Sequence, residues 1–185
     1  MLAWRGHLGR YLKWMRTGPL ARSSSAIQIR RGRLADLNAL WELESRVFAM
    51  DGISRRSLRR LLASPSAVVL VAEADHTIAG IAVVLFRATS AVARLYRLAV
   101  APKKTGRGIA SALLVASERI SKSRQCRSLR LEVHEKNHGA IRLYRRAGYR
   151  EFGKYRQYYS DRGHALRFEK QLARHGGSND NCGRC

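Results

Sequence analysis

The stretch from Leu95 to Leu114, which reads LYRLAVAPKKTGRGIASALL, constrains the fold of this chain more than any other. It begins with an apolar run of strand character, Leu95 to Val100, and continues into a short basic turn, Lys103 to Gly108. A helical pattern follows, with Ile109, Leu113 and Ala116 on one face. The order strand, glycine turn, helix presents unpaired backbone N–H groups at a helix start, where the peptide dipoles stabilise an anion.

The turn itself has the composition of a phosphate-binding loop. Gly106 and Gly108 let the backbone approach a phosphate without a Cβ in the way, and Arg107, Lys103 and Lys104 add positive charge. We therefore predict a pyrophosphate ligand. The alternative interpretation is an ordinary strand-to-helix turn with basic solvent contacts.

Two motifs at a suitable separation favour the first interpretation. TGRGIA, from Thr105 to Ala110, resembles the acetyl-CoA pyrophosphate loop of the GNAT acetyltransferases, although Thr105 departs from the usual Gln or Arg. LEVHEKNHGAIRLYRRAGY, from Leu131 to Tyr149, is similar to the second half of that family's signature. The resemblance covers roughly Ile27 to Leu172, and it is to the ribosomal-protein-alanine N-acetyltransferases, which modify protein N-termini.

The resemblance implies a fold and a cofactor. The fold is α/β, with a mixed, mostly antiparallel central sheet of about seven strands flanked by about four helices. The co-substrate is acetyl-CoA, with no metal. The implied contacts to it are Leu98, Ala99, Val100, Thr105, Gly106, Arg107, Gly108, Ile109, Ala110, Ser111 and Asn137. Of these, the backbone of Leu98 to Val100 would polarise the thioester, on a strand edge freed by the splaying of two strands.

The resemblance also implies two catalytic side chains. Glu132 matches the proton acceptor of the alanine N-acetyltransferases, and its alternative is a solvated strand carboxylate paired with Arg130 or His134. Tyr144 matches the phenol that protonates the leaving thiolate, and its alternative is a core tyrosine. His134 shares the strand face of Glu132, and histidine is a common general base in proteins, so it competes with Glu132 as the base.

Three further residues have both a functional and a structural interpretation. Tyr158 and Tyr159 resemble the loop that covers the acceptor peptide in this family, or they are surface aromatics of a hairpin. Asn137 resembles a contact to CoA, or it is a helix N-cap.

The local patterns agree with an α/β fold. Ala67 to Ala74 and Ile78 to Phe86 are apolar, β-branched runs joined by a tight turn, as in a hairpin. Leu129, Leu131 and Val133 alternate with polar residues, which is typical of a strand with one apolar face. A first helix is predicted from residues that recur at helical spacing, which are Leu34, Leu37, Leu40, Trp41, Glu44 and Phe48. A second helix is predicted after Ser54, a candidate N-cap.

The charge is unusual. Lys and Arg number 36 against 13 Asp and Glu, and the formal net charge is +23. Anionic partners are therefore favoured, such as a ribosome, RNA or an anionic membrane, and the alternative explanation is an arginine-rich genomic composition.

The chain divides into a basic N-terminal extension at 1–26, an acetyltransferase domain at 27–173 and a disordered tail at 174–185. The extension is interpreted as a poorly structured segment, a membrane-surface helix or an organellar transit peptide. Cys182 and Cys185 form a single CxxC, which is a poor zinc site, and Cys126 is a small apolar filler. No stretch is long and apolar enough to span a membrane, so we expect a cytoplasmic protein, with an organellar location as the alternative.

The sequence therefore predicts an acetyl-CoA-dependent N-acetyltransferase that transfers acetyl directly to a protein or peptide N-terminal amine. The alternatives are a small-molecule amine acetyltransferase and a non-catalytic protein of this fold that binds RNA or ribosomes.

Overall fold

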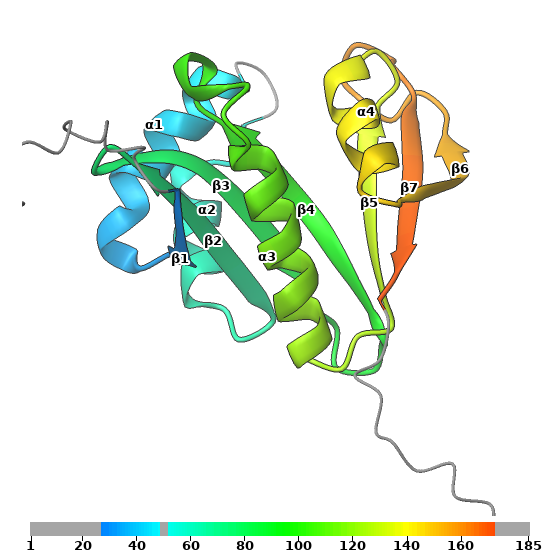
Figure 1. The fold of residues 1–185 in the computed structure, drawn as a ribbon, viewed down its shortest axis with the longest axis horizontal. Coiled ribbons are helices and arrows are strands. Elements are labelled where there is room, and N and C mark those ends of the chain that lie inside the picture. Colours follow the sequence, from blue (N-terminus) through cyan, green and yellow to red (C-terminus); the bar gives the residue numbers. More distant parts are fainter. Residues whose placement is uncertain (1–26, 49–51, 173–185) are drawn as a thin grey trace, which may run out of the picture.

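Seven strands form a single sheet in the computed structural model, which describes residues 27–48 and 52–172 (Figure 1). Their order is β1-β2-β3-β4-β5-β7-β6, and every pairing is antiparallel except that of β4 with β5. The strands are β1 (Gln28–Arg31), β2 (Ala67–Ala74), β3 (Thr77–Leu85), β4 (Val92–Val100), β5 (Ser128–His134), β6 (Arg150–Tyr155) and β7 (Ala165–Gln171).

Four α-helices cover the sheet, two on each face. They are α1 (Leu37–Val47), α2 (Arg55–Ala63), α3 (Ile109–Ser123) and α4 (His138–Arg146), with short 3-10 turns at Leu34–Asp36 and Pro102–Lys104. The α1–α2 pair packs on β2 and β3 in one apolar cluster, whereas α3 and α4 belong to a second cluster on the opposite face. The predicted mixed sheet of about seven strands with about four helices is confirmed.

The helix boundaries follow from local chemistry. Ser54 and Asn137 are N-caps, since their side chains accept hydrogen bonds from the backbone N–H groups of Ser57 and Ala140. After α4 the chain turns at Gly148, whose φ of +85° suits a residue without a Cβ.

The predicted first helix is present, but not every residue of its predicted apolar period is buried. Leu34 and Trp41 are exposed, whereas Glu44 is completely buried. Glu44 lies 3.4 Å from Arg97 and accepts a hydrogen bond from the Ile53 backbone N–H at 3.3 Å. Burial raises the pKa of this carboxyl group, although the nearby Arg97 charge opposes the shift. Cys126 is buried against the core, as predicted.

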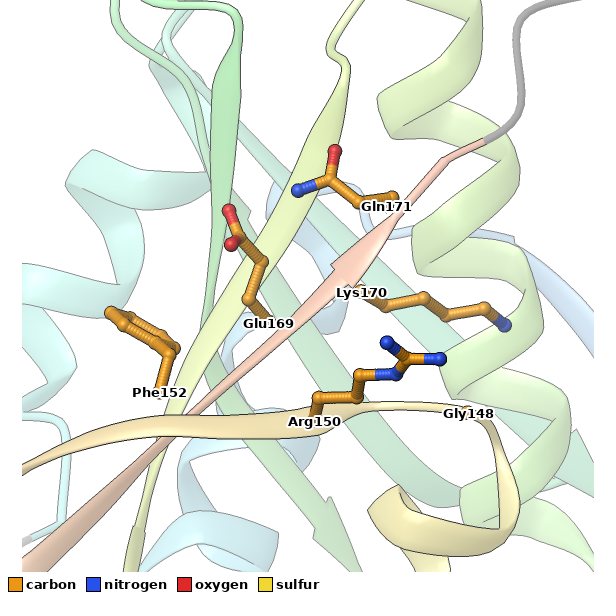
Figure 2. A pocket seen from close by; sticks show the side chains of 6 residues that line it. All are labelled: Gly148, Arg150, Phe152, Glu169, Lys170 and Gln171. Carbon is orange, nitrogen blue, oxygen red and sulfur yellow. The ribbon is translucent and has the colours of Figure 1, made fainter.

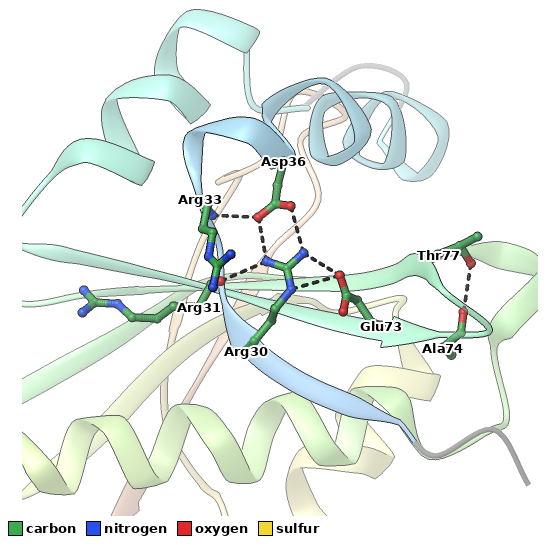
Figure 3. Close-up of polar contacts among 7 residues, drawn as sticks. All are labelled: Arg30, Arg31, Arg33, Asp36, Glu73, Ala74 and Thr77. Carbon is green, nitrogen blue, oxygen red and sulfur yellow. Dashed lines mark hydrogen bonds and ion pairs between the residues drawn. The ribbon is translucent and has the colours of Figure 1, made fainter.

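A charge cluster ties β1 to β2 and to the start of α1 (Figure 3). Arg30 donates to both carboxylate oxygens of Asp36, at 2.7 and 2.8 Å, and to Glu73 at 2.5 and 2.9 Å. Asp36 also accepts from the Arg33 backbone N–H at 2.7 Å. Bidentate, charge-assisted bonds of this kind fix geometry strongly, so β1 is anchored at the edge of the sheet.

No helix within residues 27–48 and 52–172 has the length and hydrophobicity that a membrane span requires. The predicted extension 1–26 and the whole predicted tail 174–185, with its Cys182–Cys185 pair, lie outside the described residues.

Candidate active site

The pairing between β4 and β5 is short and leaves an opening in the sheet. The two strands pair over four residues, from Val92 opposite Ser128 to Leu95 opposite Leu131. Both strands continue beyond this point without pairing to each other, and Figure 1 shows them diverging toward α4. Leu98 to Val100 therefore pair only with β3, and alternate backbone groups of this segment face the opening.

The glycine turn lies at the end of β4, beside this opening. Gly106 and Gly108 have φ values of +78° and +80°, and a Cβ built on either would meet nothing within 4 Å. The backbone is therefore left-handed and uncovered, as a phosphate-binding turn requires. Ile109 is buried and anchors α3, while Ala110 and Ser111 form the first turn of that helix. These residues fit the pyrophosphate of a CoA molecule.

The basic side chains of the turn have protein partners. Lys104 forms an ion pair with Asp75, and the Arg107 Nη1 lies 3.1 Å from the Asp75 Oδ2. Thr105 donates its hydroxyl to the Pro102 carbonyl at 2.9 Å. The side chains of Lys104 and Arg107 are thus held by the β2–β3 turn, and sequence reasoning missed Asp75, whose φ of +54° marks it as a turn residue.

Glu132 lies at the point where β4 and β5 part. It follows Leu131, the last residue of β5 that pairs with β4, and its side chain is only 12% exposed. Its Oε2 accepts from the Arg94 Nε at 2.8 Å, and the Arg94 Nη2 donates to the Tyr158 hydroxyl at 3.1 Å. The predicted alternative partners are wrong, because Arg130 pairs with Glu169 and His134 with Asp161.

Tyr144 approaches the opening from the opposite face. It is buried in α4, with its ring 6.4 Å from that of Phe168, which pairs with Leu131. Glu132 points to the other face of the sheet, as the strand alternation requires. The two predicted catalytic residues therefore flank the opening from its two sides. Burial raises the pKa of Tyr144, so its phenol stays protonated at neutral pH.

Both ring nitrogens of His134 have partners. Nδ1 accepts from the Lys136 backbone N–H at 3.0 Å, which leaves the proton on Nε2, 3.1 Å from Asp161. This arrangement disfavours His134 as the base. Asn137 caps α4, as its structural interpretation predicted.

The predicted acceptor loop lies next to the Glu132 pair. Tyr158 is 47% exposed and touches Arg94, while the ring of Tyr159 lies 4.8 Å from that of His134. The structure thus brings Tyr158 beside Glu132 and adds Arg94, which sequence reasoning missed.

Comparison with known proteins identifies the family to which this chain belongs. The Acetyltransferase (GNAT) family profile matches residues 36–149, which span both the glycine turn and α4. The chain belongs to the GNAT family of acetyltransferases. It is accordingly an acyltransferase.

A Bacillus subtilis (strain 168) protein, to which ribosomal protein bS18-alanine N-acetyltransferase activity is ascribed, is 29% identical over 135 residues, covering 73% of this chain and 88% of that protein. The crystal structure of the ribosomal-protein-S18-alanine N-acetyltransferase from Escherichia coli matches with a TM-score of 0.74 at 24% identity, covering 83% of this GNAT chain and 99% of the other. The structure of the PaiA N-acetyltransferase from Thermoplasma acidophilum in complex with coenzyme A matches with a TM-score of 0.66 at 23% identity. The match covers 79% of this chain and 99% of the other.

Proposed function

We propose that this GNAT protein transfers acetyl from acetyl-CoA directly to the N-terminal amine of a protein, with its catalytic domain at 27–173. One observation carries the proposal: the β4–β5 opening has the glycine turn at its end, Glu132 on one face and Tyr144 on the other. The relatives named for ribosomal protein alanine acetylation support a protein acceptor.

Each residue has a defined task in this proposal. Acetyl-CoA, when bound, supplies the acyl thioester. Backbone N–H groups at the free edge of β4 stabilise the oxyanion that develops on the carbonyl. Glu132 accepts a proton from the acceptor ammonium, directly or through water, because an N-terminal ammonium of pKa about 8 is mostly protonated at neutral pH. Tyr144 holds a proton on its hydroxyl for the leaving thiolate.

Arg94 adds a requirement to this scheme. Its guanidinium holds the Glu132 carboxylate at 2.8 Å, so the acceptor ammonium must compete with it for the same oxygens. Burial lowers the pKa of Arg94, but the Glu132 charge and hydrogen bonds outweigh this and raise it, so Arg94 stays charged. We propose that Arg94 keeps Glu132 oriented toward the opening until an acceptor amine arrives.

The test is acetylation of a pool of synthetic peptides with free N-termini, followed by mass spectrometry and by CoA release. Wild-type protein should acetylate α-amines, and Glu132→Gln should lower kcat/KM by about 10² or more while acetyl-CoA binding is retained. Equal turnover in wild type and Glu132→Gln would exclude this role for the carboxylate. Transfer to free polyamines or amino acids, but to no peptide, would exclude a protein acceptor.

The basic surface supports a second role, contact with an anionic partner such as ribosomal RNA. The exposed face of α2 carries Arg55, Arg56, Arg59 and Arg60, and none of them pairs with a carboxylate among the described residues. An acceptor that is a ribosomal protein would place the enzyme in the cytoplasm, which we propose as its location.

A further inference from the structure

One half of the sheet has a face that helices do not cover. The side chains of residues that lie opposite each other on neighbouring strands point to the same face of a sheet. On the uncovered face, Arg94 of β4 lies opposite Arg130 of β5, and Glu132 of β5 lies opposite Arg167 of β7. α3 and α4 pack on the other face, and the α1–α2 cluster contains no residue of β5, β6 or β7. The polar side chains of this half are therefore open to a partner.

Exposed aromatic rings gather on this face. Tyr96, Phe152, Tyr155 and Tyr158 are 39 to 47% exposed, and they make up four of the seven large, exposed hydrophobic side chains in the described ranges. Scattered single exposures are ordinary, but a contiguous exposed apolar patch is typical of an interaction site.

The rings and guanidinium groups form a continuous row that ends at Glu132. The Tyr155 and Tyr158 rings stack at 5.6 Å, and Arg167 lies 4.3 Å from Tyr155 and 4.4 Å from Phe152. Arg130 lies 4.9 Å from Phe152, and at the other end Tyr158 contacts Arg94, the partner of Glu132. We call this set the aromatic–arginine row, which consists of Arg94, Tyr158, Tyr155, Arg167, Phe152 and Arg130.

The row ends beyond Phe152 in a hollow of about 550 Å³ (Figure 2). Arg150, Glu169 and Gln171 are among the residues that line it. The two carboxylates on this face are already paired, Glu132 with Arg94 and Glu169 with Arg130. Arg167 and Arg150 have no carboxylate partner among the described residues, and the buried Nε of Arg167 has no hydrogen-bond acceptor there. The face therefore has a surplus of positive charge.

The aromatic ring faces are already occupied, which favours a peptide with acidic side chains over a single-stranded nucleic acid as the partner. Single-stranded nucleic acids bind by stacking bases on free aromatic faces. Here Tyr155 is stacked on both Tyr158 and Arg167, and Phe152 is in contact with both Arg130 and Arg167. What remains available are ring edges and guanidinium N–H groups, which suit carboxylates and peptide side chains.

We propose that the aromatic–arginine row binds the acceptor polypeptide downstream of its N-terminal residue, and that it selects acceptors with acidic side chains there. This inference rests on the proposed function. Arg167 lies opposite Glu132 on the neighbouring strand, and its guanidinium reaches over Tyr155 and Phe152 toward β6. An extended chain rises about 3.3 Å per residue, so the third residue of an acceptor lies about 7 Å from its amine, within reach of this guanidinium. An acceptor amine at Glu132 would thus place its third to sixth residues along Arg167 and toward Arg150.

The experiment compares three acceptors that share their first two residues: a dipeptide amide, and two hexapeptides with either Glu or Lys at positions three to six. With wild-type protein, the acidic hexapeptide should have a kcat/KM about tenfold above that of the basic one, through charge complementarity. Arg167→Glu should invert this ratio. Inversion cannot result from misfolding, which would lower all three activities together.

Two further variants sharpen the test. Arg119→Glu, on the exposed side of α3, changes the net charge equally and should leave the ratio near its wild-type value. Arg150→Glu, in the hollow, should lower the ratio without inverting it, and it guards against poor folding of Arg167→Glu. Equal shifts in the Arg119 and Arg167 variants would mean long-range electrostatics only and would overturn the proposal.

The remaining outcomes separate the two proposals. If the dipeptide is acetylated but the hexapeptides do not differ, the row has no selective role and the proposed function stands. If wild-type protein acetylates none of the three, both proposals fail. Tight binding of a single-stranded RNA oligonucleotide that Arg167→Glu abolishes, with no peptide preference, would assign the row to nucleic acid and overturn the peptide proposal.

Discussion

At the scale of single residues, two buried tyrosines allow a clean test of the proton donor. Tyr144 and Tyr149 lie 5.9 Å apart between ring centroids, and burial raises the pKa of both phenols. If Tyr144 protonates the thiolate, Tyr144→Phe should lower kcat about 10²-fold, because general-acid catalysis typically contributes that much. Steady-state kinetics with a saturating peptide acceptor would measure the loss.

Tyr149→Phe is the matched control. It removes a neighbouring phenol that lies outside the opening, so kcat should stay within a factor of about two. A similar loss in both variants would indicate a packing effect and would contradict a specific role for Tyr144.

For Glu132, the sequence predicts the face of the strand but not the ion-pair partner. Alternation of Leu131 and Val133 with polar residues was sufficient to place the Glu132 side chain on the polar face of β5. Its partner, Arg94, is 38 residues away and comes within reach only through the parallel register of β4 and β5. Such a register depends on tertiary packing, so the structural alternative named the nearer Arg130 and His134 as partners, and neither pairs with Glu132.

At the scale of elements, Gly108 links the glycine turn to α3. Its φ of +80° is strained for any residue with a Cβ, although there is space for one. Gly108→Ala should therefore cost about 1 kcal/mol of folding free energy and weaken CoA binding by altering the direction of the turn N–H groups. Thermal unfolding and titration calorimetry with CoA would measure the two effects.

Gly139→Ala is the contrasting substitution, because Gly139 lies in α4 without a positive φ and with space for a methyl group. It should raise stability by up to about 1 kcal/mol, the difference in helix propensity. Destabilisation by Gly139→Ala, or unchanged stability and CoA affinity in Gly108→Ala, would contradict this account.

The Arg30–Asp36 pair should give a pH-dependent contribution to stability. The hydrogen bonds from Arg30 hold the pKa of Asp36 below its usual value, despite partial burial. A carboxyl group of this kind stabilises the fold above its unfolded-state pKa of about 3.9, and the contribution is lost as the pH falls through the lower folded-state value. Asp36→Asn should cost about 2 kcal/mol at pH 7, and the difference from wild type should shrink below about pH 4.

Denaturant unfolding at several pH values measures this difference. Glu42→Gln serves as the control, because its i,i+4 pair with Arg46 is exposed and should contribute less than about 0.5 kcal/mol. A pH-independent cost of Asp36→Asn would show that the carboxylate acts by packing rather than by charge.

At the scale of the whole molecule, part of the net charge of +23 lies in α2, where it opposes local stability. In α2, Arg55 and Arg56 occupy the first turn, where the helix dipole disfavours cations, and Arg59 and Arg60 repeat the charge one turn later. This arrangement is explained if a polyanion neutralises it.

Replacing the four α2 arginines with Gln should therefore weaken binding to single-stranded RNA. The slope of log K against log salt concentration should become shallower by up to about 3, from a contribution of about 0.7 per phosphate contact. Fluorescence anisotropy at several salt concentrations measures this, and Arg142→Gln with Arg146→Gln, on the exposed part of α4, is the comparison pair. An unchanged slope in the α2 variant would exclude α2 as the contact surface.

The overall architecture was predictable where neighbours in sequence are neighbours in space. The β2–β3 hairpin and the strand–turn–helix from β4 to α3 follow from local patterns. The order β5-β7-β6 and the end of the β4–β5 pairing depend on contacts between distant segments, and the opening itself was expected only through the family resemblance. The β-bulge at Phe152, which brings its ring into the row, has no local signal that we can identify.

The four-residue ladder between β4 and β5 is the only strand pairing, within the described residues, that joins β1–β4 to β5–β7. The relative tilt of these two blocks is therefore the least restrained large-scale motion that the hydrogen-bond pattern allows. A coenzyme bonded along β4 and in contact with α4 would restrain that tilt. Co-substrate binding would then also set the distance between Glu132 and Tyr144 before the acceptor binds.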